Sequence, residues 1–186
     1  MSGGTRLETN RLIIREFEGG DWKAIHEYAS DPEVVKFMEW GPSSEAQTRE
    51  FVGEAIASSG VIPRINYHLV VALRDSGRII GSGRIGISNP ANRGADIGYS
   101  FRRDEWGKGY GTESAVALLA FGFESLKMHR IMATTHPLNK ASGRVLEKSG
   151  FRYEGRRRED KLVRGEWRDT LVFSILEQDW ANRKKG

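Results

Sequence analysis

Cysteine is absent from all 186 residues. A disulfide framework and a thiolate metal site are therefore excluded. A covalent intermediate on a cysteine is excluded as well, so any group transfer must run directly from donor to acceptor or use another nucleophile. Internal repeats, low-complexity tracts and Pro/Ser-rich linkers are also absent. Together with the length, this favours one domain spanning residues 1–186.

Long apolar runs are missing too. No run approaches the roughly 20 residues that a membrane-spanning helix needs, and the first six residues lack the apolar stretch of a signal peptide. We therefore expect a cytoplasmic protein with no membrane partner. A strong charge of one sign is likewise absent, because 29 Lys and Arg oppose 25 Asp and Glu, for a net charge of +4. These charges are interleaved, which favours a solvated surface and disfavours nucleic acid as a partner.

What is present is the composition of a globular protein, with 38% hydrophobic and 29% charged residues. Asp21 is expected to cap a first helix, and Ser44 to Gln47 has the spacing of a capping box before a second one. Gly150 is expected just past the end of a helix over 139–149. The predicted strands are 12–17, 67–73, 78–87, 96–101, 130–135, 151–158 and 169–176. The order of strands and helices predicts an α/β protein with a mixed sheet and helices on its faces.

The strongest local signal is Trp106-Gly107-Lys108-Gly109-Tyr110-Gly111-Thr112, which follows a predicted strand and opens a helix. Alternate glycines let a phosphate approach the backbone, and the free N–H groups of a helix start favour its negative charge. The run matches neither a Walker loop nor a dinucleotide fingerprint, because the glycine spacing differs and the next strand ends in Thr135-His136 rather than an acid. The segment by itself is also consistent with a tight turn that binds no ligand.

Several ordered segments of the chain resemble the GNAT acetyltransferases, and within them the RimJ/RimL branch. The matching segments are Thr9-Asn10-Arg11-Leu12-Ile13-Ile14-Arg15, Ile97-Gly98-Tyr99-Ser100-Phe101, Trp106 to Glu113, Asn139-Lys140-Ala141-Ser142, Leu146 to Phe151, and Gly165-Glu166-Trp167-Arg168-Asp169. The resemblance implies a single mixed, mostly antiparallel sheet of about seven strands, flanked by about four helices and splayed at an acetyl-CoA slot. It also places the end of the last strand near Trp180.

The resemblance assigns the cofactor, acetyl-CoA, to two stretches of backbone. The pyrophosphate would lie on the N–H groups of Gly107, Lys108, Gly109, Tyr110, Gly111 and Thr112. The pantetheine arm would pair with Ser100, Phe101 and Arg102. Trp106 departs from the Arg or Gln that opens this motif in the general family, although it is usual in the RimJ/RimL branch.

Two residues at the start of the helix over 139–149 match the family's Asn-x-x-Ser. The resemblance suggests that Asn139 hydrogen-bonds the pantetheine amides and that Ser142 lies near the thioester sulfur, where it would protonate the leaving thiolate. Both have a structural alternative, since Asn139 can be only a helix cap and Ser142 can satisfy the first helical turn.

A catalytic base is harder to identify. Deprotonating a lysine side chain at pH 7 costs about 4.6 kcal/mol, whereas an α-amino group costs only about 1.4 kcal/mol. Asp96 and Glu154 are the candidate bases, with a solvated strand carboxylate as the alternative for each. His68 and His136 could titrate usefully, but a histidine without a placed partner is more often structural. The basic residues Arg152, Arg156, Arg157 and Arg158 could bind an acidic acceptor or the ribose phosphate, or could simply be solvated.

These observations predict an N-acetyltransferase that moves an acetyl group directly from acetyl-CoA to a primary amine, most favourably a protein or peptide N-terminal α-amine. A small-molecule amine such as an antibiotic, a polyamine or an amino acid is the first alternative. A non-catalytic acetyl-CoA-binding module is the second. A nucleic-acid binder lacks a helix-turn-helix, finger or aromatic RNA motif. No metal is expected. The sequence is compatible with a homodimer.

Overall fold

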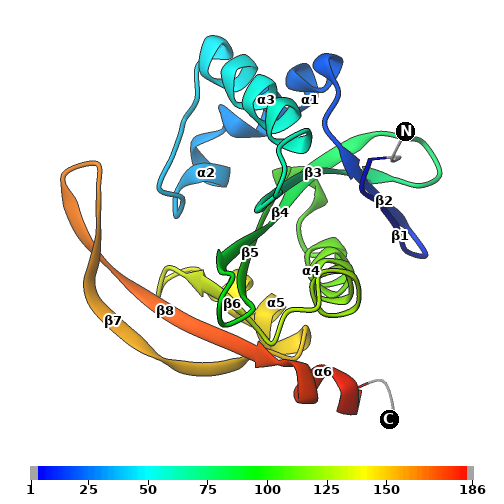
Figure 1. Ribbon diagram of the computed structural model, residues 1–186. Coiled ribbons are helices and arrows are strands. Elements are labelled where there is room, and N and C mark those ends of the chain that lie inside the picture. Colours follow the sequence, from blue (N-terminus) through cyan, green and yellow to red (C-terminus); the bar gives the residue numbers. More distant parts are fainter. Residues whose placement is uncertain (1–3, 184–186) are drawn as a thin grey trace.

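The strands of the computed structural model, which describes residues 4–183, form one eight-stranded sheet (Figure 1). Its order is β1-β2-β3-β4-β5-β6-β8-β7. All neighbours are antiparallel except β5 and β6, which are parallel. The strands are β1 (Arg6–Glu8), β2 (Leu12–Glu16), β3 (Asn66–Leu73), β4 (Ile79–Asn89), β5 (Gly94–Phe101), β6 (Arg130–Thr135), β7 (Arg152–Val163) and β8 (Glu166–Leu176). The α-helices are α1 (Trp22–Ala29), α2 (Pro32–Val35), α3 (Glu45–Ser59), α4 (Tyr110–Ala120), α5 (Lys140–Lys148) and α6 (Glu177–Arg183).

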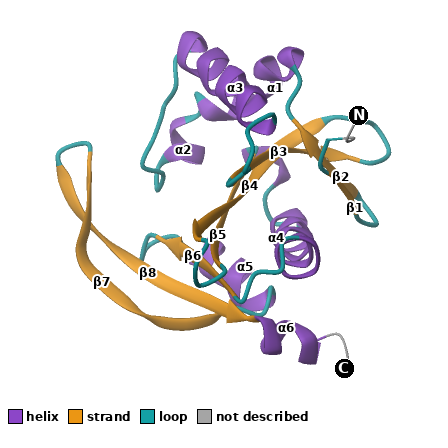
Figure 2. Cartoon of the chain, in the orientation of Figure 1, coloured by secondary structure: helices purple, strands orange, loops and turns teal. Residues whose placement is uncertain are grey.

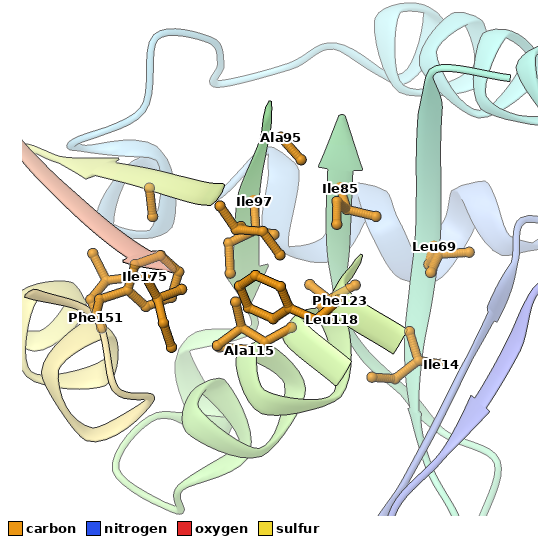
Figure 3. Packing of buried hydrophobic residues seen from close by; sticks show 14 of the residues in the cluster. Ile14, Leu69, Ile85, Ala95, Ile97, Ala115, Leu118, Phe123, Phe151 and Ile175 are labelled. Carbon is orange, nitrogen blue, oxygen red and sulfur yellow. The ribbon is translucent and has the colours of Figure 1, made fainter. Parts of the chain in front are cut away.

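Helices cover both faces of the sheet, and the side-chain alternation of β3 shows how. Leu69 and Val71 point into the core beneath α4, whereas Val70 points into a second core beneath α1, α2 and α3. Figure 3 shows the larger core, where Leu118 of α4 packs against strand residues such as Ile85. The predicted mixed, mostly antiparallel sheet with helices on its faces is confirmed.

One predicted helix start and one predicted helix end are also confirmed. In the capping box of α3, the N–H of Gln47 donates to Ser44 Oγ at 3.3 Å, and the N–H of Ser44 donates to Gln47 Oε1 at 2.8 Å. Asp31 begins the short α2 by accepting the N–H of Glu33 at 2.9 Å. Gly150 follows α5 with a φ of 97°, a conformation that favours glycine.

The sheet has one more strand and two more helices within residues 4–183 than the sequence predicted. β1 has three residues, too few for alternation to indicate a strand. α2 has four residues, and periodicity does not reveal so short a helix. α6 lies where the last strand was expected to continue toward Trp180, so that expectation was wrong.

The end of β8 has a clear physical cause. The carboxylate of Asp179 accepts the N–H of Leu176 at 3.2 Å and so ends the pairing. The helix that follows buries Trp180, whose ring stacks on Phe123 with centroids 5.8 Å apart. Strand alternation carries no information about a side-chain contact of this kind.

Asp21 stands at the start of α1, but its side chain does not cap the helix as predicted. Its two carboxylate oxygens instead accept from the guanidinium of Arg15, at 2.8 and 3.0 Å, and one of them accepts the N–H of Glu18 at 2.8 Å. An ionised partner makes a stronger hydrogen bond than a neutral N–H. The contact joins β2 to the start of the helical layer.

α4 is the buried helix that its composition predicted. Ala115, Leu118 and Leu119 are fully buried, and the helix continues as a π-helical turn from Phe121 to Ser125. Gly122 in that turn lies against β6, where an added Cβ would come within 2.5 Å of the Ile131 side chain. Within residues 4–183, no helix is both long enough and apolar enough to cross a membrane.

A glycine keeps β4 close to β5, and its replacement provides a test of the fold. In Gly81→Ala, the new Cβ would lie 2.3 Å from the Ser100 carbonyl oxygen and 2.7 Å from the Phe101 ring. We predict a free energy of unfolding lower by about 1–3 kcal/mol, as overpacking usually costs. Chemical denaturation measures it. Gly53→Ala in α3 is the control, because its Cβ meets nothing within 4 Å, and it should stabilise by up to about 1 kcal/mol. Unchanged stability of Gly81→Ala contradicts the packing argument.

Candidate functional site

The sheet opens between its two parallel strands. β5 and β6 pair at only three positions, Gly94↔Arg130, Ala95↔Ile131 and Asp96↔Met132. Both strands continue past that point, β5 to Phe101 and β6 to Thr135. Residues 97–100 therefore present a strand edge with no strand beside it. Figure 2 shows β5 and β6 in the middle of the sheet. We call the opening between residues 97–100 and the end of β6 the slot, and it is the splay that the family resemblance implied.

A cavity of about 960 Å³, the slot cavity, fills this opening and extends beneath α1 and α3. Its floor is the sheet, and its far wall is formed by the helical layer and the segment that follows α2. The floor residues include His68, Ser82, Arg84, Asp96, Ser100 and Thr134. The aromatic residues of the opposite wall include Tyr28, Phe37, Trp40 and Phe51. The cavity is thus largely aromatic on one side and polar on the other.

The segment 36–43, which we call the strap, forms the outer wall of the slot cavity. The β7–β8 hairpin holds it, because Arg164 at the hairpin turn donates to the carbonyl oxygen of Trp40 at 2.9 Å. At its other side, Phe37 stacks on His136 at the end of β6, with ring centroids 5.1 Å apart. The strap therefore bridges from the helical layer to both sides of the slot.

The glycine turn follows β5 directly and has the backbone form that glycine permits. Gly107 has a φ of 78° and Gly109 a φ of 86°, so both occupy the left-handed region. α4 begins at Tyr110, and the first three N–H groups of a helix have no partner within it. Gly111 is different, because its Cβ would face Val145 of α5 at 3.4 Å. A Cβ at this third glycine would therefore make only an ordinary van der Waals contact with α5.

Hydrogen bonds hold the glycine turn in place. They also occupy some of the backbone groups that were expected to pair with the pantetheine arm. Lys108 donates to Glu105 at 3.0 Å. The indole N–H of Trp106 donates to the carbonyl oxygen of Phe101 at 2.9 Å, and the N–H of Arg102 donates to Ile80 at 2.9 Å. The Phe101 carbonyl and the Arg102 N–H therefore have partners already. Because Arg102 and Ile80 form a hydrogen-bonded pair, the alternation of the antiparallel ladder also turns the backbone groups of Ser100 toward Ser82 of β4. The backbone groups that face the open edge are those of Ile97 and Tyr99.

Asn139 and Ser142 both line the slot cavity. Asn139 caps α5, because its side-chain oxygen accepts the N–H of Ser142 at 3.1 Å. The Ser142 hydroxyl lies 3.3 Å from the hydroxyl of Tyr99, which comes from β5 across the slot. Burial raises the pKa of Tyr99 to about 12, so this tyrosine keeps its proton at neutral pH. The remaining predicted residue, Thr112, lies in the first turn of α4 and lines a separate groove.

The two candidate bases occupy different places. Asp96 lines the slot cavity and forms an ion pair with Arg84. Glu154 does not line it. Its carboxylate accepts from the Ser174 hydroxyl at 2.7 Å and pairs with Arg130. The Ser174 hydrogen bond and then Arg130 lower the pKa of Glu154. The structure therefore brings Asp96, and not Glu154, together with Ser142.

Both candidate histidines lie in the wall of the slot cavity. Burial, and then the charge of Arg84, lowers the pKa of His68, whose ring packs edge-on against Phe51 at 5.6 Å. Burial also lowers the pKa of His136. The Nδ1 of His136 accepts the N–H of Leu138 at 3.1 Å, which places the proton of the neutral ring on Nε2. Each ring has a packing role that the sequence did not reveal.

The arginines of β7 lie outside the slot cavity. Arg152 pairs with Asp179, Arg156 with Asp169 and Arg157 with Asp160. The strand forms one edge of the sheet, and the acidic partners balance much of its charge. Among residues 4–183, no group of three or more His, Asp and Glu side chains has the arrangement of a metal site.

Sequence reasoning assigned no role to Tyr99 or to Arg84. Tyr99 stands inside one of the recognised segments, and alternation places it on the opposite face of β5 from Asp96. Arg84 pairs with Gly98 in the β4–β5 register, which puts its side chain diagonally beside Asp96. The hairpin register was therefore the signal that could have found the ion pair.

Known proteins share this fold and these segments. A model of the acetyltransferase (GNAT) domain matches residues 11–152. The uncharacterised N-acetyltransferase YnaD of Bacillus subtilis is 35% identical over 174 residues, covering 94% of this chain and 98% of its own. The [ribosomal protein uS5]-alanine N-acetyltransferase of Escherichia coli is 29% identical over 188 residues, which cover 95% of this chain and 93% of the E. coli protein. A GNAT-family acetyltransferase structure from Bacillus anthracis superposes with a TM-score of 0.83 at 35% identity, covering 94% and 99%. The resemblance seen in the motifs is confirmed, and the chain belongs to the GNAT family of N-acetyltransferases.

Proposed function

We propose that this acetyltransferase transfers the acetyl group of acetyl-CoA directly to the α-amine of a protein or peptide N-terminus. The observation that carries the proposal is the slot cavity, which joins the open edge of β5 to a pocket large enough for an amine substrate. The pyrophosphate would bind the N–H groups at the start of α4, favoured by the helix dipole. The pantetheine arm would then follow residues 97–100 of β5 into the slot.

The charges that line the cavity support an acceptor with a single amine. Its two carboxylates are both paired, Asp96 with Arg84 and Glu39 with Lys161. A polyamine carries several positive charges and needs carboxylates that are free to bind them. The cavity offers no surplus of negative charge for that purpose, and its aromatic wall suits an apolar or small neighbouring side chain.

The energetics of the amine point the same way. At pH 7 an α-amine needs about 3 kcal/mol less help to lose its proton than a lysine side chain does. Asp96, held beside Arg84, is the base that the cavity offers. A carboxylate in an ion pair is a weak base, which is adequate for an α-amine. The relative in E. coli, an alanine N-acetyltransferase by name, adds weight to an N-terminal acceptor.

The acid would stand on the other side of the slot. The amine nitrogen attacks the thioester carbon, its proton goes to Asp96, and the carbon–sulfur bond breaks to leave a thiolate. The Ser142 hydroxyl gives that thiolate its proton, and the Tyr99 hydroxyl, 3.3 Å away, replaces the serine proton. Serine alone is a poor acid. Burial makes Tyr99 a weaker acid than a free tyrosine, with a pKa of about 12, but it is still more acidic than a serine hydroxyl. The pair therefore makes a better donor than Ser142 by itself.

The base assignment predicts unequal effects for the two carboxylates. Asp96→Asn removes the proton acceptor and should lower kcat by about 10²-fold, as loss of general-base catalysis does. Glu154→Gln is the matched comparison, since Glu154 lies outside the slot cavity, and it should change kcat much less. Steady-state thiol release with saturating acetyl-CoA measures both. A larger loss for Glu154→Gln rejects Asp96 as the base.

The acid assignment predicts a kinetic signature for two hydroxyl groups. Ser142→Ala and Tyr99→Phe should each lower kcat by about 10-fold or more, with little change in the KM for acetyl-CoA, because proton donation acts in the transition state. Tyr153→Phe is the control, since this tyrosine is 55% exposed on β7. Pre-steady-state acetyl transfer shows whether chemistry limits the rate. If chemistry is limiting and kcat is unchanged in both variants, the proton relay is excluded.

The proposed acceptor predicts where the acetyl group goes. Peptides with a free N-terminus and an internal lysine should be acetylated at the α-amine, because that amine is easier to deprotonate. Mass spectrometry locates the modification, and spermidine and small monoamines are screened beside the peptides. Acetylation confined to lysine contradicts the α-amine preference. If only a small amine is turned over, the acceptor is a small molecule and not a protein N-terminus. If no amine gives thiol release, a non-catalytic acetyl-CoA-binding module is favoured.

A further inference from the structure

The turn between β1 and β2 contacts the first turn of α4, although 104 residues separate Thr9 from Glu113. The Thr9 hydroxyl donates to Glu113 Oε1 at 2.6 Å, and the backbone N–H of Arg11 donates to the same oxygen at 3.0 Å. The Nε of Arg11 donates to the other oxygen, Oε2, at 2.7 Å. Figure 1 shows the β1–β2 hairpin beside α4. The matching segment near the N-terminus thus contacts the matching segment from Trp106 to Glu113.

Arg11 also contacts the glycine turn itself. Its Nη1 donates to the carbonyl oxygen of Lys108 at 3.0 Å, and its guanidinium lies 4.6 Å from the ring centroid of Tyr110. In a trans peptide the C=O of one residue and the N–H of the next point in opposite directions. The N–H of Gly109 is therefore directed away from Arg11.

The same contacts control the charge at the start of α4. Glu113 lies in the first helical turn, and its side chain is only 18% exposed. Burial opposes its ionisation, but hydrogen bonds from Thr9 and Arg11 outweigh burial and lower the pKa of Glu113. An ionised carboxylate here would repel a bound diphosphate. The guanidinium of Arg11, 2.6 Å from Glu113 Oε2, neutralises it.

The β1–β2 turn is in turn attached to the sheet. The N–H of Arg74, just after β3, donates to the carbonyl oxygen of Arg11 at 2.9 Å, and its guanidinium donates to the carbonyl oxygen of Thr9 at 2.9 Å. The contacts therefore run from β3 through the β1–β2 turn to the glycine turn. A rigid support of this kind reduces the ordering that a ligand must impose.

We propose that Thr9, Arg11 and Glu113 form a clamp that positions the glycine turn for the pyrophosphate of the coenzyme. The inference rests on the proposed placement of the pyrophosphate at this turn. Arg11 is a positioning residue, because it acts through the Lys108 carbonyl and through neutralisation of Glu113. Its effect is confined to ligands that carry the diphosphate.

Binding of CoA and of pantetheine, which lacks the diphosphate, tests the clamp without any acceptor. Calorimetry measures CoA, and ligand-observed NMR measures the weaker pantetheine. Arg11→Ala should bind CoA about tenfold more weakly, the size expected for a lost charge-assisted hydrogen bond, with pantetheine affinity unchanged. Arg6→Ala is the control, because Arg6 pairs with Glu8 on the exposed surface of β1. Thermal unfolding shows that each variant is folded.

A double variant separates positioning from a general loss of structure. Arg11→Ala leaves Glu113 as an unpaired negative charge, so Arg11→Ala/Glu113→Gln should bind CoA more tightly than Arg11→Ala alone. Unchanged CoA affinity in Arg11→Ala, or equal losses for CoA and pantetheine, overturns the clamp while leaving the proposed function intact. A wild-type protein that does not bind CoA overturns the proposed function and the clamp with it.

Discussion

The end of pairing between β5 and β6 is the constraint on which the site depends. Backbone N–H and C=O groups inside a protein must find partners, and an open strand edge leaves them unsatisfied. After Asp96 and Met132 the two strands separate, so the edge of residues 97–100 has no strand neighbour on that side. In the proposed function, the amide groups of the pantetheine arm would supply the missing partners. The same separation gives the slot cavity its room.

The two walls of the slot cavity differ in how firmly they are held. β5 is paired with β4 along its other edge, and Gly81 lets the two backbones approach closely. The strap is held by contacts at partly exposed positions, such as Lys161 with Glu39, and each such contact contributes little. In the proposed function, the coenzyme side would therefore be held more firmly than the acceptor side. This difference suits a fixed coenzyme and an acceptor whose neighbouring residues vary.

The sequence predicted the long helices and strands, whose hydrophobic residues recur regularly, and the glycine turn. It did not predict contacts between distant segments. The helix over 139–149 and the strand over 130–135 follow from periodicity, because each buries one regular face. β1 and α2 are too short for a period, and α6 is fixed by the burial of Trp180 and by Asp179. The prediction of the site was incomplete for the same reason. The contact of Tyr99 with Ser142 and that of Glu154 with Ser174 join residues far apart in the sequence, so neither produces a local sequence pattern. Glu154 and Asp96 looked equivalent because the sequence does not show which carboxylate faces the slot.

A single strand separates the two proton transfers of the proposed reaction. Side chains three positions apart on a strand point to opposite faces, so Asp96 and Tyr99 of β5 face different sides of the slot. Attack on the thioester and departure of the thiolate then occur with the base toward the acceptor and the acid toward α5. Neither group needs to change roles, because direct transfer requires one proton removed and one donated. Since an α-amine is already close to deprotonation at neutral pH, it needs only a weak base, and the ion pair of Asp96 with Arg84 keeps the acceptor side of the cavity electrically balanced.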